Sequence, residues 1–231
     1  MTPDRSNAPI PTMTQTIQRT FRALLASACV MLLFASSATQ ACAGQYNAVL
    51  NIGDAAPRWD GLDGTDGNKH SYKELADAKC VVVAFTCNSC PYARDVEDRV
   101  IALAKDYASR GVRVVAINVN LVAEDLLPEM QRRAQERSFP FPYLHDPTQQ
   151  IAKDYGAIKT PEFFVLDGSG KVAYMGALDD SPDGKAVTKR HVAEAVEAVL
   201  AGKAPTLRET VPIGCRVRYA RDARGTKAPT P

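Results

Sequence analysis

The stretch KCVVVAFTCNSCPY, residues 79–92, decides the fold, because a run of apolar residues ends there in two closely spaced cysteines. Consecutive valines without polar alternation predict a strand that is covered on both faces. Pro91 cannot belong to a central strand, but it fits the first turn of a helix. We therefore expect Cys87 and Cys90 at a strand-to-helix junction, on the first turn of that helix.

The position of the two cysteines predicts reactive thiols. The first backbone N–H groups of a helix lack helical partners and carry the positive end of the helix dipole. A thiolate at that end is stabilised, which lowers the cysteine pKa and makes the sulfur a nucleophile at neutral pH. The two-residue spacing lets the second sulfur attack a mixed disulfide that has formed on the first.

Two other interpretations of Cys87 and Cys90 stay open. C-x-x-C is half of a zinc site, but zinc usually takes four ligands, and His70, His145 and His191 are scattered along the chain. A purely structural disulfide is the second alternative. The short loop that it would close removes little chain entropy, which weighs against it.

Length and charge restrict the class of protein. The 231 residues, 45% of them hydrophobic, fit one globular domain with additional segments. The formal net charge of +2 gives no electrostatic argument for a nucleic-acid partner.

Residues 1–43 predict a secretory signal peptide. Arg19 and Arg22 precede an apolar block at residues 23–34, and Ala41-Cys42-Ala43 gives an A-x-A cleavage pattern. The block is shorter than an ordinary membrane span of ~20 residues. We therefore expect no membrane span after cleavage, and a periplasmic or secreted protein.

Two details of this segment stay open. Met13 is an alternative start. Cys42 is an alternative site of lipid attachment, although residues 39–41 match a lipoprotein signal poorly.

The exported part keeps four cysteines, which are too few to hold the fold in place of an apolar core. Cys80 lies in the predicted strand, and we expect it to be buried packing. Cys215 has three open roles, namely exchange with Cys87 and Cys90, cross-linking of chains, or none, and we favour the last.

Strands and helices alternate along residues 44–219, the predicted domain. A hairpin and a helical turn at residues 71–76 come before the cysteines. Helices are expected from Pro91 to Gly111 and at residues 123–138, 147–155 and 186–201. Strands are expected at residues 112–120, 139–144 near a sheet edge, 162–167 and 171–175. This order predicts an α/β fold with a mixed, mostly parallel sheet and helices on both faces. Residues 220–231 are expected to be a disordered tail.

Three motifs make the chain resemble the thioredoxin-like superfamily. They are Gly53-Asp54-Ala55-Ala56-Pro57, the FTCNSCP sequence at residues 85–91 and the TPEFFVLD sequence at residues 160–167. The chain is most similar to the redoxin branch, which includes thiol reductases and the alkyl-hydroperoxide-reductase/thiol-specific-antioxidant group. Ile213-Gly214-Cys215 also resembles an ending found in redoxin proteins.

The resemblance implies a role for four residues. Cys87 would be the exposed attacking thiolate and Cys90 the buried resolving thiol. Pro161 would be a cis proline facing them, and Thr160 would offer backbone groups to a substrate chain. The resemblance implies a three-layer fold and no cofactor or metal.

The chain departs from thioredoxin at two positions. Thr86 replaces the tryptophan before the first cysteine, and Val81 replaces a buried aspartate that helps to move protons. The route by which Cys90 loses its proton is therefore unassigned, with Lys79, Asp95 and Glu162 as candidates.

We expect an exported thiol–disulfide oxidoreductase that exchanges disulfides in partner proteins and is restored by an external thiol donor. A thiol peroxidase acting on a peroxide through a sulfenic acid is an alternative. Peroxiredoxins carry Thr-x-x-Cys, but here Cys87 stands at the threonine position and no clear partner arginine is seen. A second alternative is a binding module on the same fold, with the pair locked as a disulfide or holding copper(I).

Overall fold

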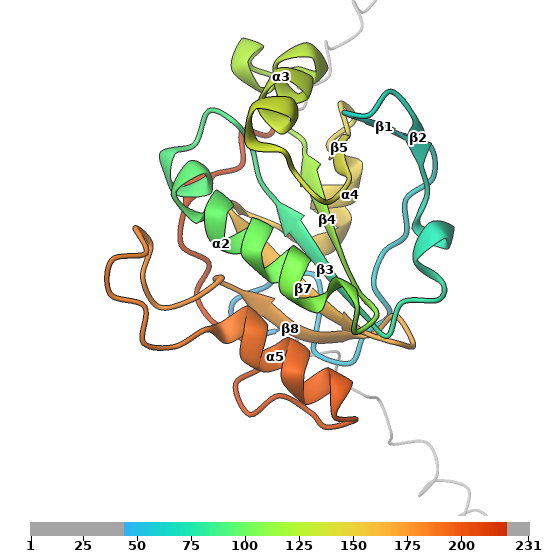
Figure 1. Ribbon diagram of the computed structural model, residues 1–231, viewed down its shortest axis with the longest axis vertical. Coiled ribbons are helices and arrows are strands. Elements are labelled where there is room, and N and C mark those ends of the chain that lie inside the picture. The colour runs from blue at the N-terminus through green and yellow to red at the C-terminus, as the bar shows by residue number, and fades with distance from the viewer. Residues whose placement is uncertain (1–43, 221–231) are drawn as a thin grey trace, which may run out of the picture. The chain divides into compact units, whose positions relative to one another are not determined.

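The computed structural model describes residues 44–220 (Figure 1). Its central strand is β3 (Cys80–Phe85), in which every residue is buried. Val81, Val83 and Phe85 point into one apolar core, and the alternate residues point into a second core on the opposite face. The run lacks polar alternation because both of its faces are covered, as predicted.

The sheet has seven strands in the order β2-β1-β5-β4-β3-β7-β8. Parallel pairing is confined to β5 (Tyr143–His145), β4 (Val112–Asn118) and β3. The flanking strands all pair antiparallel, and they are β1 (Leu62–Gly64), β2 (Lys69–His70), β7 (Glu162–Asp167) and β8 (Val172–Gly176). The sheet is mixed as expected, but it is less parallel than the alternation of strands and helices predicts. A separate small sheet pairs β6 (Lys159–Thr160) with β9 (Cys215–Arg216).

Helices cover both faces and confirm the predicted three-layer α/β architecture (Figure 1). On one face, α2 (Pro91–Ala108) and α5 (His191–Leu200) pack into the same core as Val82 and Ala84. On that face α3 (Leu127–Arg137) packs Met130 against Ala116 and Tyr143. On the other face, α4 (Gln150–Tyr155) packs against Phe85 and Phe164 through Tyr155.

Some element boundaries differ from the sequence predictions. The helix expected at residues 123–138 is a short 3-10 turn, η2 (Ala123–Asp125), followed by α3, with extended backbone at Leu126 between them. Pro128 explains the break, because proline fits only the first turn of a helix. The last helix starts at His191 rather than residue 186.

The strand expected near an edge is an internal strand, so that prediction is wrong. β5 starts after Pro142, which leaves its backbone free to pair with both β1 and β4. The hairpin β1–β2 and the turn η1 (Tyr72–Leu75) are confirmed, whereas β9 was not predicted.

The predicted signal peptide, residues 1–43, lies outside the described residues, and so does the predicted tail beyond Ala220. Ala220 itself is held, because its backbone N–H donates to Gln149 Oε1 at 2.7 Å. Among residues 44–220, no helix has the length and apolar character that a membrane crossing requires.

Candidate active site

The two cysteines of the C-x-x-C motif lie between β3 and α2. Pro91 is the first residue of α2, and Cys90 is its N-cap residue. Cys87 lies three residues earlier, in the loop that follows Phe85. We expected both cysteines on the first helical turn. Cys90 is at the start of the helix, as expected, but Cys87 lies before it.

The predicted cis proline faces these cysteines. The Thr160–Pro161 peptide bond is cis and lies between β6 and β7. Cys90 Sγ donates to the Thr160 carbonyl oxygen at 2.9 Å, and Cys87 Sγ donates to Thr160 Oγ1 at 3.4 Å. The fold thus brings together all four residues named from the sequence, although 70 positions separate Cys90 from Thr160.

Both cysteines are buried. The relative exposure of Cys87 is 4%, and that of Cys90 is 2%. The expected contrast between an exposed Cys87 and a buried Cys90 is therefore not present. The cause is their setting beneath Thr160 and beside a third cysteine, Cys215.

The two thiols share their protons unequally. Interaction with the Cys87 side chain lowers the pKa of Cys90 to about 5, with further lowering by the Cys215 side chain and the backbone N–H of Ala93. Interaction with Cys90 and burial raise the pKa of Cys87 well above its ordinary value. When Cys90 ionises, it can no longer donate a hydrogen bond to the Thr160 carbonyl, which disfavours the thiolate. The neighbouring donors and the helix dipole stabilise the thiolate by more than this one lost bond. The interaction between the two sulfurs therefore favours ionisation of one thiol and disfavours ionisation of the other.

Cys215 also lies at the site, although the sequence analysis favoured no role for it. It lies on β9, directly opposite Thr160 in the small sheet. Its side chain packs against Cys87, Cys90 and Ala93, and it is only half-buried. Burial and the neighbouring Cys90 raise the pKa of Cys215 to about 11.

A buried carboxylate supports the C-x-x-C loop from below. Asp125 accepts hydrogen bonds from the backbone N–H of Ser89 at 2.9 Å and from Ser89 Oγ at 2.6 Å. Asn120 Nδ2 donates to the same carboxylate at 3.0 Å, and Asn118 Nδ2 donates to the Asp125 carbonyl at 2.8 Å. One sequence signal could have indicated this network. Asn118 is the last residue of β4 and Asn120 follows it, and the parallel neighbours β3 and β4 end at the same edge of the sheet, where the cysteines lie.

The charge of Asp125 also acts on the thiols, because it contributes to the raised pKa of Cys87. Asp125 is therefore a candidate for the residue that exchanges protons with the thiols. Of the three proton-relay candidates named from the sequence, Asp95 is exposed, and Lys79 and Glu162 make hydrogen bonds away from the thiols. Lys79 donates its backbone N–H to Gly111, at the start of β3. Glu162 is buried beside Pro161, and its Oε2 accepts from the backbone N–H groups of Ile158 and Lys159.

Comparison with known proteins identifies the family. The model of the AhpC/TSA family matches residues 52–175, more than half of the chain. The chain belongs to the AhpC/TSA family. This confirms the resemblance to the redoxin branch of the thioredoxin-like superfamily. The thiol:disulfide interchange protein DsbE of Allochromatium vinosum is 25% identical to this AhpC/TSA protein over 127 residues. These residues are 54% of this chain and 66% of DsbE, just under two thirds of that relative.

Solved structures confirm the fold of this AhpC/TSA protein. An uncharacterized conserved protein from Geobacillus kaustophilus has a TM-score of 0.72 and 35% identity, covering 77% of this chain and 96% of its own. A hypothetical protein from Sinorhizobium meliloti has a TM-score of 0.72 and 34% identity, covering 76% and 98%. Peroxidoxin BcpB from Mycobacterium tuberculosis, with a TM-score of 0.53, 21% identity and coverage of 66% and 97%, shares the fold.

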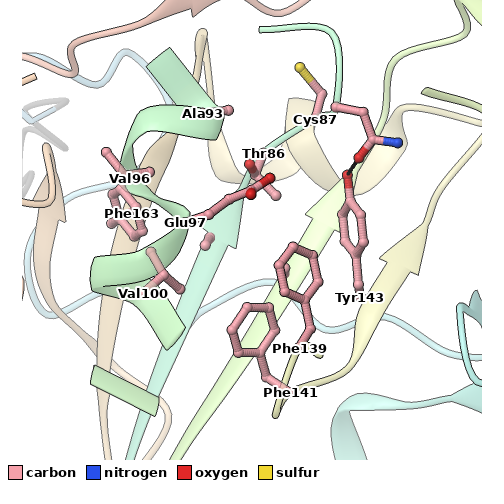
Figure 2. A pocket seen from close by; sticks show the side chains of 13 residues that line it. Thr86, Cys87, Ala93, Val96, Glu97, Val100, Phe139, Phe141, Tyr143 and Phe163 are labelled. Carbon is pink, nitrogen blue, oxygen red and sulfur yellow. Dashed lines mark hydrogen bonds between the residues drawn. The ribbon is translucent and has the colours of Figure 1, made fainter. Parts of the chain in front are cut away.

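Two small hollows in the AhpC/TSA protein are lined by residues of the site, the first by Cys87 and the second by Pro161. The first, of about 20 Å³, lies between α2 and the aromatic residues Phe139, Phe141 and Tyr143, and Cys87 is part of its lining (Figure 2). It has room for about one water molecule. The second, of about 10 Å³, is lined by Pro161 together with Tyr92 and Ile213, which are exposed apolar side chains.

The zinc interpretation of the C-x-x-C motif needs further ligands beside the two cysteines. Within residues 44–220, no three or more His, Cys, Asp or Glu side chains are grouped so as to hold a metal ion.

Proposed function

We propose that this protein is an exported thiol–disulfide oxidoreductase whose C-x-x-C dithiol exchanges disulfides with partner proteins. The observation that carries the proposal is the contact of both thiols with Thr160, the residue before a cis proline, at the N-terminus of α2. Similarity to a thiol:disulfide interchange protein supports the same class of chemistry. Export rests on the signal-peptide pattern of residues 1–43.

We propose that Cys90 takes the first step, the reverse of the order that the resemblance implies, because its pKa is lowered. Its thiolate attacks one sulfur of a substrate disulfide, so that a mixed disulfide forms and the other substrate sulfur leaves as a thiolate. The Cys87 thiol then gives up its proton and attacks Cys90 Sγ, which releases the second substrate thiol. Two electrons pass to the substrate, and an external dithiol must restore the Cys87–Cys90 pair.

Tyr92, Pro161 and Ile213 offer a surface for a partner protein. Tyr92 and Ile213 are 42% and 37% exposed, and both line the hollow beside Pro161. An apolar surface next to a reactive sulfur suits an unfolded or loosely folded chain that carries a disulfide.

The test is reduction of insulin by dithiothreitol, which the wild-type protein should accelerate. Trapping then separates the two orders of attack. Because Cys215 packs against both cysteines, it is replaced in each trap. A Cys87→Ser/Cys215→Ser variant should accumulate mixed disulfides on Cys90, and a Cys90→Ser/Cys215→Ser variant should accumulate few. If the variant that lacks Cys90 is the better trap, Cys87 attacks first, and if neither the wild type nor a variant reacts, the proposal is wrong.

A peroxidase is the second candidate, because the lowered pKa of Cys90 also favours oxidation to a sulfenic acid. Membership of the AhpC/TSA family is compatible with either activity. Consumption of hydrogen peroxide with a recycling thiol, at a rate that exceeds insulin reduction, would favour this candidate over disulfide exchange.

A further inference from the structure

The C-terminal strand β9 lies on the backbone edge that the resemblance reserves for a substrate chain. β9 pairs antiparallel with β6, and Cys215 stands opposite Thr160. The contact is close enough to require glycine at the preceding residue, since a Cβ on Gly214 would lie 2.2 Å from the Thr160 carbonyl oxygen. The chain's own strand therefore occupies the edge of β6 at Thr160.

This strand brings a third thiol to the reactive pair. Cys215 packs against Cys90, Cys87 and Ala93, and its proximity helps to lower the pKa of Cys90. The three cysteines and Ala93 form one packed cluster. Cys215 is half-buried, whereas Cys87 and Cys90 are buried, so Cys215 is the sulfur of the three that solvent reaches most easily.

Hydrogen bonds just after Cys215 hold the strand in this position. The backbone N–H of Val217 donates to the Ile158 carbonyl at 3.0 Å. The backbone N–H of Arg218 donates to Asn120 Oδ1 at 3.0 Å, which connects the strand to the network around Asp125. Cys215 is thus fixed over Cys90 by tertiary contacts and does not depend on the two-residue ladder alone.

We propose that Cys215 is a third redox residue, which forms a disulfide with Cys90 and carries oxidation from the buried pair to the protein surface. This inference rests on the proposed function of the Cys87–Cys90 pair. β9 then acts as a built-in substrate strand, and the external dithiol meets the Cys90–Cys215 disulfide.

The exchange conserves atoms and electrons. After substrate reduction, a Cys87–Cys90 disulfide is present. The Cys215 thiol loses its proton and attacks Cys90 Sγ, a Cys90–Cys215 bond forms, and the Cys87–Cys90 bond breaks. Cys87 takes up the proton. Burial and the neighbouring Cys90 raise the pKa of Cys215 to about 11, and positive charge from Arg218 and Lys159 opposes this shift. The contribution of a charged Cys90 is absent once Cys90 is in the Cys87–Cys90 disulfide. An external dithiol then reduces the new disulfide and is itself oxidised.

The test uses oxidised glutathione on the purified, fully reduced chain. In a Cys80→Ala/Cys87→Ser variant, Cys90 should first form a mixed disulfide, and Cys215 should then expel the glutathione. Mass spectrometry should find no retained glutathione and a disulfide between tryptic peptides 80–94 and 209–216. The matched Cys80→Ala/Cys87→Ser/Cys215→Ser variant should retain one glutathione on Cys90.

The wild-type chain provides a second measurement that does not depend on how the variants fold. Treated with limiting oxidised glutathione, it should also yield peptides 80–94 and 209–216 joined by a disulfide. Retained glutathione beside a free Cys215 in the variant, or no joined peptides in the wild type, would overturn the inference. The assay needs no protein substrate, so a failure to reduce insulin would refute the proposed function without affecting this result.

Discussion

Ser89 donates two hydrogen bonds to the carboxylate of Asp125, 36 positions away in the sequence, one from its backbone N–H and one from its hydroxyl. Ser89 is one of the two residues between the cysteines, and Asp125 is fully buried. A carboxylate outside the C-x-x-C loop therefore helps to fix the conformation of the loop. It lies in η2, the turn that follows the neighbouring strand β4.

Replacement of this carboxylate should destabilise the protein and alter its thiols. We expect Asp125→Asn to lower the free energy of unfolding by about 1–3 kcal/mol, because the amide nitrogen cannot accept from Ser89 or Asn120. The pKa of Cys87 should fall, since the charge that raises it is gone. Urea unfolding and the ultraviolet absorbance of thiolates measure the two effects. Exposed Glu124 provides the control, and an equal loss in Glu124→Gln would contradict the assignment.

The lowered pKa of Cys90 should be visible in its rate of alkylation. The rate with iodoacetamide should rise as the pH passes through about 5 and stay flat near neutrality. Cys90→Ser should remove this step. Cys215→Ser should move it to higher pH, since the Cys215 thiol helps to lower the pKa. A wild-type midpoint close to the ordinary cysteine value of 9.0 would contradict the assignment of Cys90 as the thiolate.

Local patterns were sufficient to predict the frame of the site. The apolar run before Cys87, and Pro91 after Cys90, predicted the strand and the helix start because each is a property of adjacent residues. The cis Thr160–Pro161 bond was predicted only from its motif, and the structure confirms it.

The missed features depend on contacts between distant residues. Asp125 reaches Ser89 only because β3 and β4 are neighbours in the sheet. β9 has two residues, too few to show a period, so nothing local placed Cys215 on Thr160. The burial of Cys87 follows from these same contacts, and sequence periodicity does not encode it.

Tyr92 should matter for protein substrates more than for small disulfides. We expect Tyr92→Ala to raise KM for insulin roughly fivefold, corresponding to about 1 kcal/mol of lost contact, with little change in kcat. Reaction with oxidised glutathione should be unchanged, because a small disulfide needs no docking surface. Tyr46→Ala is the matched control, since Tyr46 is 40% exposed and does not line the hollow beside Pro161. An unchanged KM for insulin in Tyr92→Ala would contradict docking at this hollow.

Glu162 should make stability depend on pH. Burial raises its pKa from 4.5 to about 7. Because the folded-state pKa is raised, neutral Glu162 contributes stability that is fully present below pH 4.5 and lost as the pH rises through about 7. Glutamine cannot ionise and still accepts from Ile158 and Lys159 through its oxygen. Between pH 5 and pH 8, Glu162→Gln should therefore gain up to about 3 kcal/mol relative to wild type, as measured by urea unfolding. A constant difference would show that Glu162 ionises normally.

Gly214 should control whether Cys215 can reach Cys90. A Cβ at this position would lie within 3 Å of three backbone atoms of Thr160 and Pro161, and backbone cannot move aside as a flexible side chain can. Gly214→Ala should therefore displace β9, weaken formation of the Cys90–Cys215 disulfide, and leave formation of the Cys87–Cys90 disulfide intact. Disulfide mapping after limited oxidation measures both bonds. Gly168→Ala is the control, because its Cβ would meet other atoms no closer than 3.3 Å. If both variants form the Cys90–Cys215 disulfide as readily as wild type, close pairing of β9 with β6 is not what positions Cys215.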